Sequence, residues 1–294
     1  MYGTDFEKKF KTIYSGDADF PAKLASIHDC PKKLNFIGKF DGKIFEKTLA
    51  VVGSRKITSY GKRVVEKLVG PVAASGVTIV SGFMYGVDAY SHEVCVGVGG
   101  RAVAVLPYGL DHGPPFYQKK LWDGILDNDG LIVSEFEDDF GGANWSFPKR
   151  NRVVAGLSDA TMVVEGAKRS GSLITAGHCL ENGRMLFAVP GPIDSVVSEG
   201  TNNLIKIGLA SCATSATDIL EFFGLAESAG EVRTVPVFDD THEEIIYSCV
   251  RLEPLTLDEI SEKSGLDIST IGYKAMMMCL AGYLVEKEGR FYVG

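Results

Sequence analysis

Six short runs of β-branched and other apolar residues recur between residues 47 and 223, and longer helix-like segments separate them. The runs are apolar without interruption, which is typical of strands buried on both faces of a parallel sheet. Strand and helix patterns that alternate at this spacing predict an open, doubly wound α/β domain with right-handed crossovers. The predicted strands are Thr48–Val52, Val77–Ser81, Ala102–Leu106, Leu131–Glu135, Thr161–Glu165 and Leu186–Pro190.

Predicted helices fill the intervals between these strands, and the two ends of the chain follow other patterns. The predicted α/β domain spans residues 47–224, and residues 1–46 are expected to form an extended lead-in packed on it. Residues 225–240 are polar and small and contain proline, so we expect a linker there. The predicted helices are Ser59–Ser75, Val87–Val98, Tyr117–Asp127, Pro148–Leu157, Ser172–Asn182 and Asn202–Ile207.

Residues 241–294 predict a small second domain. Three helices that end in a β-hairpin are typical of the winged-helix domain, a variant of the helix-turn-helix. The expected helices are His242–Arg251, Leu257–Ser264 and Ser269 to Ala281, and two short strands follow around Glu288-Gly289.

The charge of this second domain disfavours a role in reading duplex DNA. Residues 236–294 contain five Lys or Arg and eleven Asp or Glu, so their formal charge is 5 − 11 = −6. Because sequence-independent affinity for DNA depends on neutralising phosphates, contact with a protein is the favoured role. The third helix offers one cation, Lys274, followed by methionines at positions 276–278, and we expect at least two of these methionines to fill the core.

The composition of the whole chain excludes several classes of protein. Its 294 residues carry a net charge of −8, unlike a non-specific duplex binder with a broad basic face. No apolar run approaches the ~20 residues of a membrane helix, so no membrane contact is predicted, and the first ten residues lack a signal peptide's apolar segment. The six cysteines are scattered singly, which predicts reduced thiols in a cytoplasmic protein without a zinc site.

Open parallel sheets bind ligands at the loops that follow their strands. Gly53-Ser54-Arg55 follows the first predicted strand and combines a permissive backbone, a hydroxyl and a guanidinium suited to phosphate oxygens. The next glycine is Gly61, so the GxGxxG dinucleotide pattern is missing. On its own, this tripeptide is equally compatible with a strand-to-helix turn that carries a surface arginine.

The segment Phe147–Thr175 places a basic cluster before a second small-residue loop, Ser170-Gly171-Ser172, which opens a predicted helix. Cations near a helix N-terminus oppose the helix dipole, so their placement predicts a bound anion. The free amides of a helix start favour phosphate in the same way. The cations of the cluster are Lys149, Arg150 and Arg152.

Aromatic residues flank the basic cluster. Trp145 and Phe147 come just before its first cation, where they either stack on bases or anchor a lid over the site. Lid anchoring is the favoured role.

No catalytic pair or metal site is recognisable in the sequence. Asp88 and His92 share a helix face at i, i+4, but two ligands without a third at a recognisable spacing do not make a metal site. We expect Asp88 to cap its helix or orient a loop, and His92 to pack at the sheet edge. The sequence shows neither a nucleophile–base pair nor paired carboxylates, so we predict no catalytic residue and no cofactor.

Seven motifs occur in order along residues 20–223, and together they resemble the DNA-processing protein A family, also called DprA or Smf. The motifs are GSR (Gly53–Arg55), SGxxxGVDxxxH (Ser81–His92), AVLxxGLD (Ala104–Asp111), FPKRNRVVAGLS (Phe147–Ser158), SGSLITA (Ser170–Ala176), VPGPID (Val189–Asp194) and EGTNNLI (Glu199–Ile205).

The resemblance implies an extended Rossmann domain that binds single-stranded DNA and delivers it to the RecA recombinase during natural transformation. It also implies a homodimer without an established catalytic activity. The span before Phe147 lacks a lysine that family members often carry, so the FPKRNR cations are expected to bear more of the phosphate contact. The implied DNA- and phosphate-binding residues are Gly53, Ser54, Arg55, Gly82, Lys149, Arg150, Asn151, Arg152, Ser170, Gly171, Ser172 and Lys206.

A second interpretation comes from LOG-type enzymes, which share a related Rossmann fold and cleave nucleoside monophosphates. SGSLIT stands where their PGGxGT signature is expected, and the glutamate that follows that signature is not evident. DNA binding is therefore the favoured function.

Overall fold

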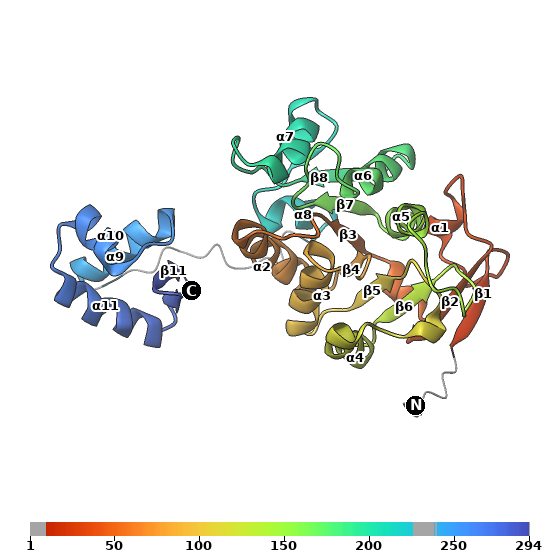
Figure 1. Cartoon of the computed structure of the whole chain (residues 1–294), viewed down its shortest axis with the longest axis horizontal. Coiled ribbons are helices and arrows are strands. Elements are labelled where there is room, and N and C mark those ends of the chain that lie inside the picture. The colour runs from red at the N-terminus through yellow and green to blue at the C-terminus, as the bar shows by residue number, and fades with distance from the viewer. Residues whose placement is uncertain (1–9, 226–237, 239, 294) are drawn as a thin grey trace. The chain divides into compact units, whose positions relative to one another are not determined.

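The computed structural model describes residues 10–225, 238 and 240–293, and its contacts divide the chain into two units, residues 1–230 and 231–294. The described part of the first unit contains one nine-stranded sheet in the order β1-β2-β6-β5-β4-β3-β7-β8-β9 (Figure 1). Neighbouring strands from β6 to β9 pair in parallel, whereas β1 pairs with β2 and β2 with β6 antiparallel. The strands are β1 (Lys11–Tyr14), β2 (Lys33–Gly38), β3 (Thr48–Val52), β4 (Thr78–Ser81), β5 (Ala102–Val105), β6 (Leu131–Ser134), β7 (Ala160–Val163), β8 (Met185–Ala188) and β9 (Ser211–Cys212).

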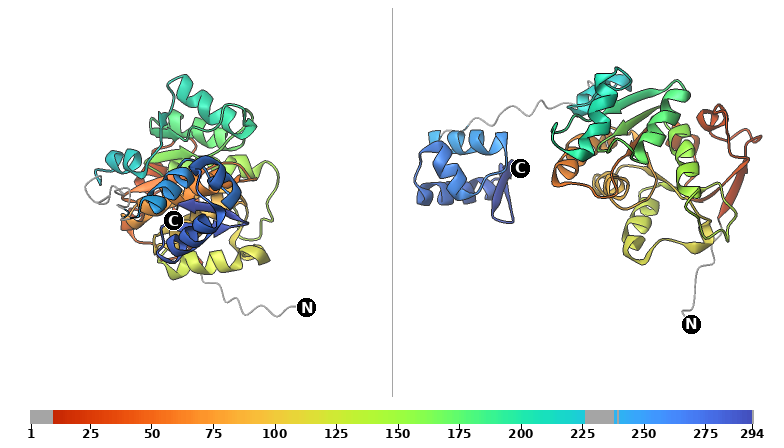
Figure 2. Two further views of the ribbon diagram at one scale, coloured as in Figure 1. Left: turned by 90° about the vertical axis from the view of Figure 1, so that its left-hand side faces the viewer. Right: turned by 45° about the horizontal axis from the view of Figure 1, so that its top comes forward.

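Helices cover both faces of this sheet (Figure 2). Successive side chains of a strand point to opposite faces, so Leu49 and Val51 join the core on one side, and Ala50 and Val52 join the core on the other. On the first face lie α2 (Ser59–Ala74), α3 (Val87–Gly97), α4 (Lys119–Asp127) and α8 (Ala216–Phe222). On the second face lie α1 (Ala22–Ala25), α5 (Ser146–Gly156) and α6 (Ser172–Glu181), and Leu204 of α7 (Glu199–Lys206) packs against the same core.

The prediction of a doubly wound α/β domain is confirmed. All six predicted strands and the six helices between them are present, and their ends differ from the predicted ones by at most three residues. Short 3₁₀ helices that the sequence pattern did not predict occur at Gly42–Phe45, Leu110–His112, Phe116–Gln118 and Val196–Ser198.

The lead-in expected over residues 1–46 contains two strands in its described part, 10–46, so it is more than an extended segment. β1 and β2 add an antiparallel edge to the main sheet, and Asn35 of β2 stands opposite Ser134 of β6. The buried side chain of Asn35 donates to the carbonyl oxygen of Phe136 at 3.0 Å and to Asp138 at 2.7 Å. β1 has a single buried residue, so it lacks the continuous apolar run that revealed the central strands.

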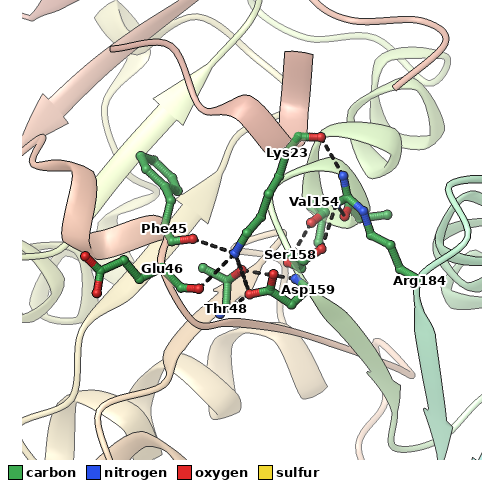
Figure 3. Close-up of polar contacts among 9 residues, drawn as sticks. Lys23, Phe45, Glu46, Thr48, Val154, Ser158, Asp159 and Arg184 are labelled. Atoms are coloured by element: carbon green, nitrogen blue, oxygen red, sulfur yellow. Dashed lines mark hydrogen bonds and ion pairs between the residues drawn. The ribbon is translucent and has the colours of Figure 1, made fainter. Parts of the chain in front are cut away.

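A polar cluster connects α1 to the amino ends of β3 and β7 (Figure 3). Lys23 donates to the carbonyl oxygen of Phe45 at 2.5 Å and to the Thr48 hydroxyl at 3.1 Å, and it forms an ion pair with Asp159. Asp159 also accepts a hydrogen bond from the backbone N–H of Thr48 at 2.9 Å. Arg184 donates to the carbonyl oxygen of Lys23 and to two carbonyl oxygens near the end of α5. The cluster therefore joins α1, β3, β7 and α5.

The described part of the second unit contains three helices followed by an antiparallel hairpin, drawn in blue in Figure 2. This element order agrees with the expected one, and the assignment to the winged-helix class stays a prediction. Most of the predicted linker, namely residues 226–237 and 239, lies outside the described residues. The elements are α9 (Thr241–Leu252), α10 (Leu257–Ser264), α11 (Ile268–Leu280), β10 (Leu284–Lys287) and β11 (Arg290–Val293).

The expectation for the three methionines of α11 is wrong. Met278 is 2% exposed, whereas Met276 and Met277 are 57% and 44% exposed. With 3.6 residues per turn, Met278 lies on the same helix face as the buried residues Ile271 and Ala275, and its two predecessors turn away from that face.

The Lys23 cluster leads to a prediction about stability. Asp159→Ala removes an acceptor shared by the Lys23 ammonium and by the Thr48 amide and hydroxyl, so it should lower the free energy of unfolding by about 2 kcal/mol. Urea unfolding measures this change. Asp123→Ala is the matched control, because it removes a half-exposed i,i+4 pair with Lys119 that contributes less than about 1 kcal/mol. Equal losses in the two variants would contradict a stabilising role for the cluster.

Candidate nucleic-acid interface

The order of the strands places a switch point between β3 and β7. From β3 the chain adds β4, β5 and β6 on one side, and it then returns to add β7, β8 and β9 on the other. Ligands of doubly wound sheets bind beyond the carboxyl ends of the strands at such a point. We call the loops that follow β3 to β7 at these carboxyl ends the loop edge.

The loop after β3 presents Arg55 to solvent. Its guanidinium carbon lies 5.4 Å from the ring centre of Phe147 and 5.9 Å from that of Tyr85, and it has no ion pair among the described residues. The neighbouring Ser54 accepts a backbone hydrogen bond from Val87 at 3.0 Å. Gly86 makes this approach possible, since its φ is +90° and a Cβ there would lie 2.2 Å from the Ser54 carbonyl oxygen.

The predicted hydroxyl and glycine of this loop have local roles in the structure. The Ser54 hydroxyl donates to the carbonyl oxygen of Lys56 at 3.0 Å and accepts from its N–H at 3.1 Å. Gly53 packs against Val87 at the start of α3. The loop is therefore held by these local contacts, and its exposed charged groups are Arg55 and Lys56.

Helix α5 presents Lys149 at the same edge. The Lys149 ammonium lies 5.7 Å from the ring centre of Trp145 and 6.0 Å from that of Phe136, and no carboxylate pairs with it in the described residues. Trp145 also packs against Phe136 and Phe140, with ring centres 5.9 and 5.5 Å away. Trp145 thus anchors this segment while 55% of its surface stays exposed.

Arg150 points in the opposite direction, into the protein. It is 3% exposed and donates to the carbonyl oxygens of Gly82 and Val105 at the ends of β4 and β5. A Cβ on Gly82 would lie 2.5 Å from both the Arg150 guanidinium and the Asp88 carboxylate, so only glycine fits there. Burial lowers the pKa of Arg150 to about 10, against the opposing effect of Asp88, and the group stays charged at neutral pH.

Arg152 is also turned inward. Its guanidinium donates to both oxygens of Glu135 at 2.8 and 2.6 Å and to Asp29 at 2.6 Å. The side chains of Arg152 and Glu135 are each 8% exposed. Hydrogen bonds with these two acids outweigh the effect of burial, which alone would lower the pKa of Arg152, and the net result is a raised pKa.

The expectation that the three FPKRNR cations form one basic surface therefore needs correction. Lys149 is exposed, whereas Arg150 and Arg152 are buried and bonded within the chain. The reason is the helical period: Arg150 shares the sheet-facing side of α5 with Val153, Val154 and Leu157, and Arg152 faces the lead-in.

The loop after β7 lies beside α5. Asn151 donates to the carbonyl oxygen of Gly171 at 3.3 Å, and the hydroxyls of Ser170 and Ser172 lie 2.8 Å apart. Helix α6 begins at Ser172 without a side-chain cap from Gly171, and the amides of its first three residues donate to Ser170 and Gly171.

Sequence reasoning missed two cations in this loop. Lys168 and Arg169 directly precede Ser170, are exposed, and have no ion pair among the described residues. Their position next to Ser170-Gly171-Ser172 was the signal that could have found them.

Lys206 is placed differently from the other predicted residues. It is the exposed last residue of α7, and no described contact joins it to the loop edge. Glu165, just after β7, holds the end of the loop between β3 and α2 in place. Its carboxylate accepts hydrogen bonds from the N–H of Thr58 at 3.1 Å and from the Thr58 hydroxyl.

Asp88 and His92 do not form a ligand site. His92 is fully buried beside Phe83, as expected for a packed residue, and burial lowers its pKa to about 3. Burial raises the pKa of Asp88 to about 6, and the charge of Arg150 opposes this shift. Across the described ranges, no group of three His, Cys, Asp or Glu could hold a metal ion, and no helix is long and apolar enough to cross a membrane.

Comparisons with known proteins agree with the motifs. The family model for DNA recombination-mediator protein A matches residues 11–224. Protein Smf of Escherichia coli (strain K12) is 34% identical over 288 residues, which cover 95% of this chain and 76% of that protein. This chain belongs to the DNA recombination-mediator protein A family. DNA processing protein DprA of Streptococcus pneumoniae (strain ATCC BAA-255 / R6) is 38% identical over 216 residues, covering 74% of this chain and 75% of that protein.

Two solved structures of the family share the fold of the first unit. The X-ray structure of DprA from Streptococcus pneumoniae aligns with a TM-score of 0.67 and 36% identity over 73% of this chain and 74% of that one. DprA from Helicobacter pylori aligns with a TM-score of 0.65 and 29% identity over 74% of this chain and 96% of that one. The structure of the Helicobacter pylori protein concerns its mode of binding single-stranded DNA.

The pairing of Arg152 leads to a second prediction about stability. Arg152→Ala leaves the buried Glu135 carboxylate without its cation, so the free energy of unfolding should fall by about 3 kcal/mol. The double variant Arg152→Met with Glu135→Leu should regain most of that loss, because it removes both buried charges. Denaturant unfolding measures both effects, with Lys149→Ala as the exposed control. A loss in Arg152→Ala no larger than in the control would show that the pair is not structural.

Proposed function

We propose that this chain binds single-stranded DNA at the loop edge and acts as a non-enzymatic recombination mediator. The observation that carries the proposal is a set of exposed cations without ion pairs in the described residues, gathered on the loops around the switch point. In an acidic chain of net charge −8, such a local cluster favours a phosphate backbone as ligand. The cations are Arg55, Lys149, Lys168 and Arg169.

Aromatic side chains beside two of these cations favour single strands over duplex. Tyr85, next to Arg55, is 48% exposed, and Trp145, next to Lys149, is 55% exposed. Unpaired bases stack on such rings without sequence preference, whereas the bases of a duplex are already stacked.

We propose that fewer residues touch DNA than the sequence motifs alone implied. Arg55, Lys149, Lys168 and Arg169 would neutralise phosphates, and Asn151 with the Ser170–Ser172 loop would supply hydrogen-bond donors. Gly53 and Ser54 would shape the turn that carries Arg55. Gly82, Arg150 and Arg152 would position α5 and the loops, and Lys206 has no part in this set.

The hydrolytic alternative has less support. Glu135 and Glu165, the glutamates next to the ends of β6 and β7, are bonded to Arg152 and Thr58. The family comparisons also favour a DNA recombination mediator over a nucleoside-monophosphate hydrolase.

Binding should depend steeply on salt. With about four phosphate contacts, the logarithm of the affinity of the full chain for oligo-dT should fall with the logarithm of salt concentration with a slope of about −3. Arg55→Glu should weaken binding at low salt by about tenfold or more and make the slope shallower by roughly 1. Fluorescence anisotropy at several salt concentrations measures both quantities.

Lys67→Glu is the matched control for this measurement, because Lys67 is an exposed cation in the middle of α2, away from its N-terminal end at the loop edge. The control should bind as the unaltered chain does. Equal affinity at low and high salt in the unaltered chain would overturn the phosphate proposal, and full binding by Arg55→Glu would remove Arg55 from the interface.

Delivery to a RecA-type recombinase is the second part of the proposal, and a homodimer is the proposed working form. On single-stranded DNA coated with a single-strand binding protein, the full chain should shorten the lag before RecA begins to hydrolyse ATP. Arg55→Glu should lose this effect and Lys67→Glu should keep it, because the effect requires the chain to hold DNA. An unchanged lag with the unaltered chain would contradict recombinase loading and leave DNA binding in place.

A further inference from the structure

The loop between β5 and α4 exposes two adjacent aromatic side chains. Phe116 is 95% exposed and Tyr117 is 70% exposed. Large apolar rings so open to water are typical of interaction sites when they lie together. This loop follows β5 and therefore lies at the loop edge, as does Arg55.

A buried side chain fixes the position of this aromatic pair. Gln118, the next residue, is 6% exposed and donates to the carbonyl oxygen of Phe83 at 3.3 Å. Phe83 begins the short loop that reaches Tyr85, over whose ring the Arg55 guanidinium lies. This hydrogen bond thus joins the loop that carries Phe116 and Tyr117 to the loop that carries Tyr85.

The start of the same loop is held beside Arg150. The carbonyl oxygen of Tyr108 accepts a hydrogen bond from the Ser134 hydroxyl at 2.7 Å. Burial raises the pKa of Tyr108 to about 12, with the charge of Arg150 acting against this shift and Tyr117 adding to it. Tyr117 and Tyr108 are therefore close enough to interact electrostatically.

The charges around the pair indicate where a nucleic-acid backbone can run. Lys119 is paired with Asp123 at 2.7 Å, and Lys120 is exposed without an ion pair in the described residues. Together with Phe116, Asp123 and Asp127, they line a hollow of about 520 Å³ along α4. Two lysines and two carboxylates line this hollow, so it has no net positive charge to attract phosphates. A backbone held by Arg55 and Lys149 would therefore direct bases toward the rings.

We propose that Phe116 and Tyr117 form a stacking platform for the unpaired bases of single-stranded DNA. This inference rests on the proposed function, since Arg55 and Lys149 hold the phosphates of the same strand. Bases are the favoured occupant because the platform continues a surface of exposed cations and rings, and every base offers a flat face for stacking. An apolar protein partner is the competing occupant, and the experiment distinguishes it from bases.

The experiment compares two ligands with the same phosphates. The affinity of the full chain is measured by fluorescence anisotropy for oligo-dT and for an oligomer of abasic sites of equal length. The variants are Phe116→Ala, Tyr117→Ala and their double substitution, with Tyr117→Phe as the conservative variant. Tyr273→Ala is the matched control, because it removes a tyrosine of similar exposure, 65%, from the second unit.

If Phe116 and Tyr117 stack on bases, their substitution should reduce only the part of the affinity that depends on bases. The preference for oligo-dT over the abasic oligomer should fall by about tenfold in the double variant, while the affinity for the abasic oligomer and its salt dependence stay unchanged. Tyr117→Phe and Tyr273→Ala should keep the preference of the unaltered chain.

Three results would overturn the platform. Retention of the full preference for oligo-dT by the double variant would assign the rings to another partner such as a protein. An equal loss for both oligomers would assign them to folding or phosphate contact. If the unaltered chain binds neither oligomer, the proposed function fails as well, whereas failure of the platform alone leaves the salt-dependent binding of both oligomers intact.

Discussion

The buried guanidinium of Arg150 joins helix α5 to the ends of β4 and β5, and the candidate interface depends on this contact. A buried charge is tolerated only where acceptors surround it, and here the carbonyl oxygens of Gly82 and Val105 take that role while Asp88 lies close by. With α5 fixed in this way, the preceding residue, Lys149, points out of the sheet. The same contact explains why residue 82 has no side chain.

The cations of the loop edge are arranged in two layers. Arg150 lies beneath the surface, and Arg55 lies close enough for its charge to contribute to the lowered pKa of Arg150, after the larger effect of burial. Like charges held together in this way are unfavourable until an anion compensates them. This repulsion gives a physical reason for a phosphate to bind at the switch point between β3 and β7.

In the second unit, by contrast, cations are paired with carboxylates of the same unit. Lys263, Lys274 and Arg290 are each paired with a carboxylate, so three of its few cations are already neutralised within the unit. At the same time α11 exposes Tyr273, Met276, Met277 and Leu280. An acidic unit with an apolar helix face agrees with the prediction that it contacts protein and not duplex DNA.

Much of the fold could be predicted because the central strands are buried on both faces and read as unbroken apolar runs, as in Thr48–Val52. The two antiparallel strands β1 and β2 were not predicted. The edge strand β1 is stabilised mainly by pairing with β2 and buries one residue. The order of the motifs was likewise sufficient to identify the family, because each motif is a short run of residues that can be recognised without knowing its tertiary contacts.

The residue types at the carboxyl ends of the strands follow from the sequence alone, because local spacing places each loop after its strand. The sequence did not determine which cations face the ligand. Lys149, Arg150 and Arg152 are near neighbours in the chain, yet packing of α5 against the sheet and the lead-in buries two of them. The directions of those side chains depend on contacts that are distant in sequence and form only in the folded chain. These contacts are with Gly82, Val105, Asp29 and Glu135.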